Sequence, residues 1–223
     1  MDNRLDAGGA VGQVYFCHRY AILFYTLLFT LVASPLVAAL EWSGTLIDLF
    51  LGANLLAAAL PSRPGLNRRL FLAAVGIAWL ARSAMAWFDH PAVAALILGF
   101  WTLIGLGAAA AALHFAMRAR QVELEHLYAA LSAYLLVGVF FGLFYWIIEQ
   151  VAPGTFNLSD GLSRMSAIYF SFVTLATLGY GDIVPRSDIA RGLAILEGVG
   201  GQLFLAVFVA RLLSLYSMRP KTD

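Results

Sequence analysis

The sequence is poor in the residues that build soluble active sites and extracellular scaffolds. Of its 223 residues only 12% are charged and one is cysteine, whereas 61% are hydrophobic. A single thiol cannot form an intrachain disulfide, and Cys17 is expected to be a small apolar packing residue. The 14 Lys and Arg residues nearly balance the 13 Asp and Glu residues and are scattered. We therefore expect no nucleic-acid partner and predict a membrane protein.

Long apolar runs fill most of the chain. A membrane-spanning helix needs about 20 apolar residues, within a range of about 17 to 25. Six runs have roughly this length, at 20–40, 44–60, 70–88, 92–117, 127–148 and 189–216. Short linkers that carry charges or prolines separate them. The sequence therefore predicts an all-α membrane protein with six transmembrane helices.

One further apolar segment, 163–176, is too short to span a bilayer. The hexapeptide TLGYGD follows it directly at 177–182, and a predicted spanning helix stands on either side. Taken alone, Gly-Tyr-Gly-Asp is a common turn composition. At membrane depth, however, irregular backbone is tolerated only where it is buried in protein or lines a water-filled cavity. The context therefore favours a re-entrant helix followed by a pore-lining loop.

Positive residues indicate the orientation, because short cytoplasmic loops are enriched in Lys and Arg. With the N-terminus inside, the predicted outer side holds only Arg164, Arg186 and Arg191 of the chain's basic residues. That side also collects acidic residues, which would raise the local cation concentration. We predict a multi-pass protein of the cell membrane with both termini, 1–19 and 219–223, in the cytoplasm.

The TLGYGD hexapeptide resembles the selectivity filter of tetrameric potassium channels, the TVGYG motif followed by its usual aspartate, with leucine in place of valine. In such filters backbone carbonyls and the threonine hydroxyl replace the hydration shell of the ion. Glycine at 179 and 181 removes the Cβ penalty at the backbone angles that this arrangement requires. The implied ion-binding residues are Thr177, Leu178, Gly179, Tyr180 and Gly181, with K⁺ held at the first four.

The resemblance covers 127–218 and implies a pore domain of outer helix, pore helix at 163–176, filter at 177–182 and inner helix. Because one chain supplies one filter segment, it also implies a homotetramer in membrane lipid. K⁺ is the implied permeant ion, and no organic cofactor is expected. Residues 20–117 would form a four-helix peripheral domain, joined to the pore by a cytoplasmic linker at 118–126.

The surroundings of the filter depart from the family pattern in places. Tyr169 is expected to hydrogen-bond Asp182 behind the filter. Phe170 stands where many members have a tryptophan, and it cannot donate to Tyr180. Thr174 or a water is the remaining candidate partner of Tyr180. The outer end of the filter is therefore expected to be less firmly braced, unless Tyr169 and Phe170 only pack the short helix.

Three residues of the predicted inner helix are candidates for gating or for lining the cavity. Gly201 lies where the family places its hinge glycine, although close helix packing explains a membrane glycine equally well. Gln202 is polar at mid-membrane and is expected to face a wet cavity. Glu197 needs a partner or water, or a proton, and is a candidate for the rear wall of the pore.

The first four predicted helices look like those of voltage-gated channels but lack the sensor charges. No lysine or arginine occurs between Arg82 and Arg118. Weak voltage dependence is therefore expected. Arg82 is predicted to pair with Asp48, or with Glu41 or Asp89, unless it reaches the outer interface alone. The sequence does not indicate the gating stimulus or a separate regulatory subunit.

Two other classes compete with a potassium-selective channel. A poorly selective cation channel is one, and a membrane transporter or enzyme subunit is the other. Four residues near the predicted linker could be imagined as metal ligands: His114, Glu123, Glu125 and His126. A solvated interfacial face is the stronger interpretation of this cluster. We therefore predict a potassium channel and not an enzyme.

Overall fold

The computed structural model describes residues 18–33, 73, 76, 91–118, 123–159 and 161–217, with side chains in all of these except 91–97 and 215–217. The regular structure in these ranges is helical apart from one isolated β-bridge between Phe156 and Pro185. The helices are His18–Ala33, α4 (Pro91–Met117), α5 (Leu124–Val151), α6 (Arg164–Leu175) and α7 (Asp188–Ser217).

Three helices in the described ranges are long and apolar enough to cross a membrane: Leu98–Met117, Leu124–Val151 and Asp188–Ser214. They correspond to the predicted runs 92–117, 127–148 and 189–216. The helix His18–Ala33 covers part of the predicted run 20–40. The runs 44–60 and 70–88 lie outside the described residues except for 73 and 76, as do the predicted partners Arg82, Asp48, Glu41 and Asp89. Six spans therefore stay a prediction.

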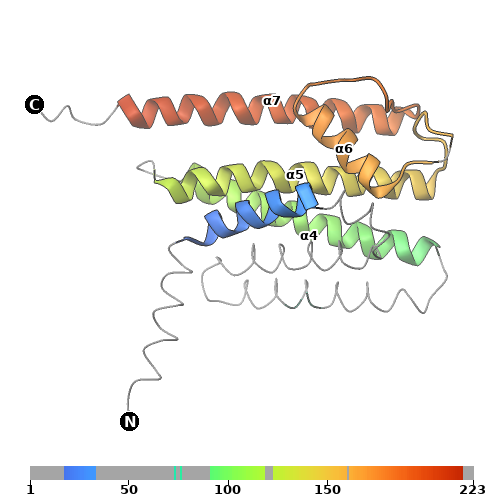
Figure 1. The fold of residues 1–223 in the computed structure, drawn as a ribbon, viewed down its shortest axis with the longest axis horizontal. Coiled ribbons are helices and arrows are strands. Elements are labelled where there is room, and N and C mark those ends of the chain that lie inside the picture. Colours follow the sequence, from blue (N-terminus) through green and yellow to red (C-terminus); the bar gives the residue numbers. More distant parts are fainter. Residues whose placement is uncertain are drawn as a thin grey trace, which may run out of the picture.

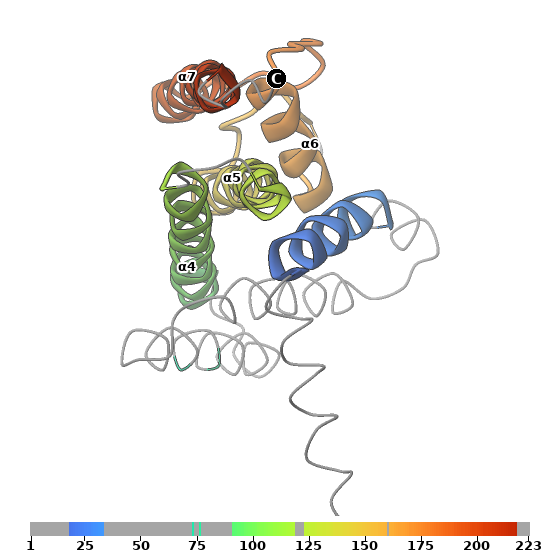
Figure 2. The same ribbon diagram turned by 90° about the vertical axis from the view of Figure 1, so that its left-hand side faces the viewer.

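Helix α5 is the centre of the arrangement (Figure 1). Helix α4 packs along it, and α6 lies between α5 and α7 at the end where α5 stops and α7 starts (Figures 1 and 2). The helix His18–Ala33 lies against the other end of α5, where the Tyr20 N–H donates to a Glu125 carboxylate oxygen at 3.0 Å. Helix α6 is thus the element that contacts both α5 and α7 near the loops.

Small residues let these helices approach closely. Seven buried alanines of α4 and α5 belong to one hydrophobic core cluster: Ala108, Ala109, Ala112, Ala116, Ala129, Ala130 and Ala133. At the α5–α6 crossing, a Cβ added to Gly142 would lie 2.5 Å from the Cα of Ile168. Only glycine fits there, because the neighbour is backbone and cannot rotate away. Helix α6 therefore sits directly on the backbone of α5, as small-residue packing in membranes allows.

The His and Glu residues considered as metal ligands lie at the corner between α4 and α5. The ring of His126 stacks on Phe115 at a centroid distance of 4.7 Å, and its Nδ1 lies 3.7 Å from a carboxylate oxygen of Glu123. Because α5 begins at Leu124, the last residues of the predicted linker 118–126 are helical. The linker is therefore shorter than predicted. Its acidic Glu125 falls in the first turn of α5, where the helix dipole favours negative charge.

Candidate ion-conduction site

Helix α6 is the predicted re-entrant helix, with Ser163 and Ala176 as its two caps. The Ser163 hydroxyl oxygen accepts the Ser166 N–H at 3.0 Å, which satisfies a free donor of the first turn. The helix has 12 residues, or about 18 Å at 1.5 Å per residue. This length is too short to cross the hydrocarbon core of about 30 Å. Helix α6 alone therefore cannot span a membrane, as expected of a re-entrant helix.

The C-terminal end of α6 is held against the middles of its two neighbours. The Tyr134 hydroxyl of α5 donates to the Leu175 carbonyl oxygen at 3.3 Å. On α7, a Cβ added to Gly201 would lie 2.9 Å from the same oxygen. Gly201 is about 20 Å along α7 from its first residue. The partial negative charge of a helix C-terminus therefore lies deep in the bundle, where it favours a cation.

The contact at Gly201 bears on its two predicted roles, hinge and close packing. With a Leu175 side-chain carbon 2.8 Å from the same added Cβ, a larger residue would collide with both backbone and side chain. The geometry supports packing, and the hinge stays a prediction.

The backbone of the filter segment alternates between two conformations. Thr177, Gly179 and Gly181 have φ of 56°, 58° and 79°, and the residues between them do not have positive φ. Positive φ at every second residue is the kind of backbone that the predicted filter requires, because alternating angles can turn successive carbonyls to one side of the chain. A β-branched residue at positive φ is a genuine outlier, and such strain clusters at functional sites. Sequence reasoning found the two glycines and missed Thr177, which shows no glycine signal.

Both neighbouring helices anchor the start of the filter. The Thr177 N–H donates to the Thr174 carbonyl at 3.0 Å, and the Leu178 N–H donates to the Val173 carbonyl at 2.9 Å. From α7, the side-chain amide of Gln202 donates to the Thr177 hydroxyl at 3.4 Å. The predicted cavity residue Gln202 therefore reaches the inner end of the filter.

Aromatic stacking and a hydrogen bond surround the outer half of the filter. The rings of Tyr169 and Tyr180 stack with centroids 6.4 Å apart and planes 4° from parallel. A side-chain hydrogen bond with Asp182 raises the pKa of Tyr169 above its usual value. Phe170 instead packs edge-on against Tyr145, at 5.0 Å. The support of Tyr180 by Thr174 stays a prediction.

The loop after α5 pairs with the segment that leaves the filter. The backbone of Asn157 donates to the Val184 carbonyl at 3.1 Å, and the Asn157 side-chain oxygen accepts the Val184 N–H at 2.7 Å. The Asn157 side-chain amide donates to the Asp182 carbonyl at 3.3 Å. One asparagine thus joins the two loops through three hydrogen bonds. Sequence reasoning assigned it no structural role, because nothing in the local pattern reveals its distant partners.

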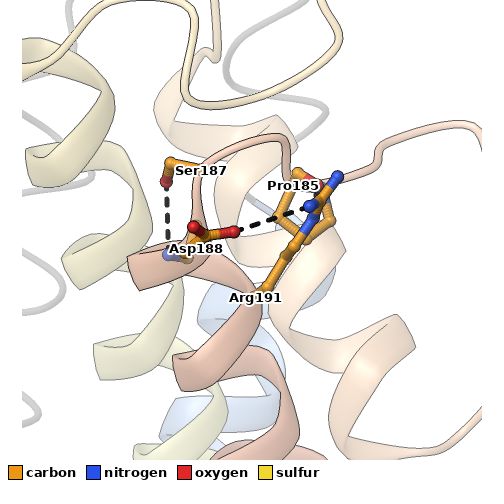
Figure 3. A network of polar contacts seen from close by, with 5 residues as sticks. Pro185, Ser187, Asp188 and Arg191 are labelled. Atoms are coloured by element: carbon orange, nitrogen blue, oxygen red, sulfur yellow. Dashed lines mark hydrogen bonds and ion pairs between the residues drawn. The ribbon is translucent and has the colours of Figure 1, made fainter.

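The start of α7 is tied back to the same segment (Figure 3). The Ser187 hydroxyl accepts the Ala190 N–H at 3.3 Å and caps the helix. The Arg191 side chain donates to the Pro185 carbonyl at 3.2 Å and lies 3.6 Å from an Asp188 carboxylate oxygen. Because Asp188 is fully exposed, solvent screens this ion pair and it adds little stability. The hydrogen bond from Arg191 joins the start of α7 to the segment that leaves the filter.

Two carboxyl side chains are buried behind this site. Glu149, 4% exposed, accepts N–H groups of Gly154 at 3.0 Å and Phe156 at 3.1 Å. Glu197, 2% exposed, contacts the hydroxyl groups of Tyr145 and Ser171. Glu197 thus has partners on both α5 and α6. Sequence reasoning missed these partners, and it counted Glu149 among the acidic residues of the predicted outer side, whereas this carboxyl group is buried.

Replacing Asn157 by alanine should loosen the outer end of the filter. The substitution removes two side-chain hydrogen bonds, each worth about 0.5 to 1.5 kcal/mol. Amide hydrogen exchange at 182–186 should therefore speed up by about tenfold or more, because each 1.4 kcal/mol is a factor of ten. Asn157→Asp keeps the acceptor for Val184 and should lie between alanine and wild type. Unchanged exchange in the alanine variant would show that Asn157 does not hold this segment.

Residues 130–217 match the model of a protein family described as "Ion channel". These residues run from the first turns of α5 through α6 and the filter to the end of α7. A comparison with solved structures found no significant match. The family match therefore covers the site described above and leaves the N-terminal part of the chain without an assignment.

Curated proteins similar to this region are potassium channels by name. The two pore potassium channel a of rice is 36% identical over 36% of this chain and 21% of its own length. The inward rectifier potassium channel Kirbac3.1 of Paramagnetospirillum magnetotacticum is 37% identical over 33% of this chain and 24% of its own length. The voltage-gated potassium channel Kch of Escherichia coli is 40% identical over 28% of this chain and 16% of its own length. The matched region is thus about a quarter or less of each relative. Residues 130–217 are therefore similar to the ion channel family, and the curated relatives of this region are named potassium channels.

Proposed function

We propose that this protein forms a potassium-selective pore and conducts K⁺ passively across the cell membrane. The observation that carries the proposal is the alternating backbone of the filter, with φ of 56°, 58° and 79° at Thr177, Gly179 and Gly181. Carbonyls turned to one side can replace the hydration shell of a dehydrated K⁺. The Thr177 hydroxyl supplies a further oxygen at the inner end. The similarity to proteins named potassium channels supports the same ion.

We propose further that four copies assemble around one axis. Leu178 and Tyr180 of the filter are 57% and 66% exposed in the single chain. Lipid cannot cover this segment, because irregular backbone facing hydrocarbon would leave its polar groups unpaired. On α7, Ile195, Leu196 and Leu203 are each at least 60% exposed. Further copies of the chain would bury both surfaces and place one filter segment each around the ion.

Gating in this proposal depends only weakly on voltage. Each elementary charge that crosses the membrane field gains about 2.3 kcal/mol per 100 mV. Helix α4 contains no lysine or arginine between Pro91 and Met117, so it carries no such charge. Residual voltage dependence would come from ions that move within the filter. It should then change with the permeant ion.

Open probability measured against voltage in symmetrical K⁺ should therefore give a shallow curve. The curve should keep its slope in Arg82→Gln, because in this proposal that residue moves no net charge through the field. A steep curve that flattens in Arg82→Gln would reveal a charge sensor and refute this part of the proposal.

Replacing Gly179 by alanine should abolish K⁺ conduction and leave assembly intact. A left-handed conformation costs an ordinary residue about 1 to 2 kcal/mol, so alanine would turn the carbonyls away from the ion. An added Cβ at Gly179 would meet no atom of the described chain within 4 Å, so its effect would come from the backbone. K⁺ flux into proteoliposomes measures conduction, and size-exclusion chromatography measures assembly.

Gly107→Ala is the matched control for this substitution. Its Cβ also meets nothing within 4 Å, but Gly107 lies inside α4 at ordinary helical angles. This variant should conduct normally and be slightly more stable, by up to about 1 kcal/mol. Normal K⁺ flux in Gly179→Ala would contradict the filter assignment.

A further inference from the structure

Behind the filter, three helices meet at one buried polar cluster, called here the Glu197 junction. It consists of Glu197 on α7, Ser171 on α6, and Tyr145 and the Gly138 carbonyl on α5. The Tyr145 and Ser171 side chains are fully buried, and Glu197 is 2% exposed. Because these side chains are buried, we expect their hydrogen-bonding groups to be satisfied within the junction.

Three oxygen-to-oxygen contacts hold the junction together. The Tyr145 hydroxyl lies 2.8 Å from one carboxyl oxygen of Glu197. The Ser171 hydroxyl contacts the other carboxyl oxygen. The same Ser171 oxygen lies 2.6 Å from the Gly138 carbonyl oxygen. Each contact needs one proton between its two oxygens, because two lone pairs at such distances repel.

The proton count decides the state of the carboxyl group. Tyrosine and serine each carry one hydroxyl proton, a carbonyl carries none, and an ionised carboxylate only accepts. An ionised Glu197 would therefore leave two protons for three contacts. If Ser171 donated its proton to Glu197, the contact between Ser171 and the Gly138 carbonyl would have no donor. If Ser171 instead donated to the Gly138 carbonyl, the contact between Ser171 and the Glu197 carboxylate would have no donor. A protonated Glu197 supplies the missing donor.

We propose that Glu197 is a neutral carboxylic acid at neutral pH and donates its proton to Ser171. The donors then run in one direction, from Tyr145 to Glu197, from Glu197 to Ser171 and from Ser171 to the Gly138 carbonyl. A neutral acid also avoids a buried, unpaired charge, which is costly. Among the described residues, the titratable side chains that face Glu197 are Tyr145 and Tyr134, both on α5, and neither is cationic. Glu197 is thus a positioning residue that ties α7 to α6.

The chain contains a matched carboxyl group with the opposite surroundings. Glu149 is nearly as buried, at 4% exposure, but its two oxygens face the N–H donors of Gly154 and Phe156. An ionised carboxylate satisfies both donors. Glutamine at 149 would turn an NH₂ group toward an N–H and lose one hydrogen bond. Glutamine at 197 would keep an acceptor for Tyr145 and a donor for Ser171.

Infrared difference spectroscopy of the full chain in lipid at neutral pH tests the protonation state. The C=O stretching band of a protonated carboxyl group should be present in wild type and in Glu149→Gln and absent in Glu197→Gln. This comparison needs no conduction, so it stands whether or not the proposed potassium selectivity is correct. A wild-type spectrum without a band that Glu197→Gln removes would overturn the proposal.

Thermal unfolding and K⁺ flux test the positioning role. Glu197→Gln should keep flux within about twofold of wild type, whereas Glu197→Ala should lower it by about tenfold or more, since unmatched buried partners are costly. Glu149→Gln should unfold at a lower temperature than Glu197→Gln. If Glu197→Gln misfolds or matches the alanine variant while Glu149→Gln behaves as wild type, Glu197 is ionised and the proposal fails.

Discussion

Irregular backbone at membrane depth has polar groups that lipid cannot satisfy, and the rest of this structure depends on that constraint. The filter segment follows a helix of only 12 residues and is exposed in the single chain, so in a membrane it needs neighbouring protein or water to cover it. Glycine at 142 lets α6 rest on the backbone of α5, and Gly201 lets α7 approach the end of α6. Close packing on both sides fixes the depth of the carbonyl end of α6, and that end presents partial negative charge to a cation.

The same constraint explains why so many contacts converge on short loops. The filter is held at its inner end by hydrogen bonds to α6 and by Gln202, and at its outer end by Asn157. Behind it, Glu149 and Glu197 bind polar groups that would otherwise be unpaired and buried. The two carboxyl groups differ only in what faces them. The Glu149 carboxyl group faces two N–H donors, which suit a negative charge. The Glu197 carboxyl group faces Ser171, whose hydroxyl proton is donated to the Gly138 carbonyl in our proposal.

The sequence predicted those features that are local in the chain. Apolar runs at 92–117, 127–148 and 189–216 predicted three helices to within a few residues, and the apolar segment 163–176 predicted the short helix α6. Glycines 179 and 181 indicated the positive φ angles because glycine is the residue that adopts them freely. The first turn of α5 was misjudged as linker, since its Glu125 and His126 are polar and gave no apolar signal.

Features that depend on distant partners could not be predicted. Tyr145 and Glu197 are 52 residues apart, and Asn157 and Val184 are 27 apart. No periodicity connects such pairs. The strain at Thr177 was equally invisible, because a threonine at that position carries no local sign of positive φ.

The reversal potential of the purified protein in a planar bilayer, with K⁺ on one side and Na⁺ on the other, tests the central claim most directly. A filter built from one-sided carbonyls at 177–180 should exclude Na⁺. The current should therefore reverse far from zero, on the side set by K⁺ permeation. A reversal potential near zero, with both ions carrying current, would contradict potassium selectivity and identify a poorly selective cation pore instead.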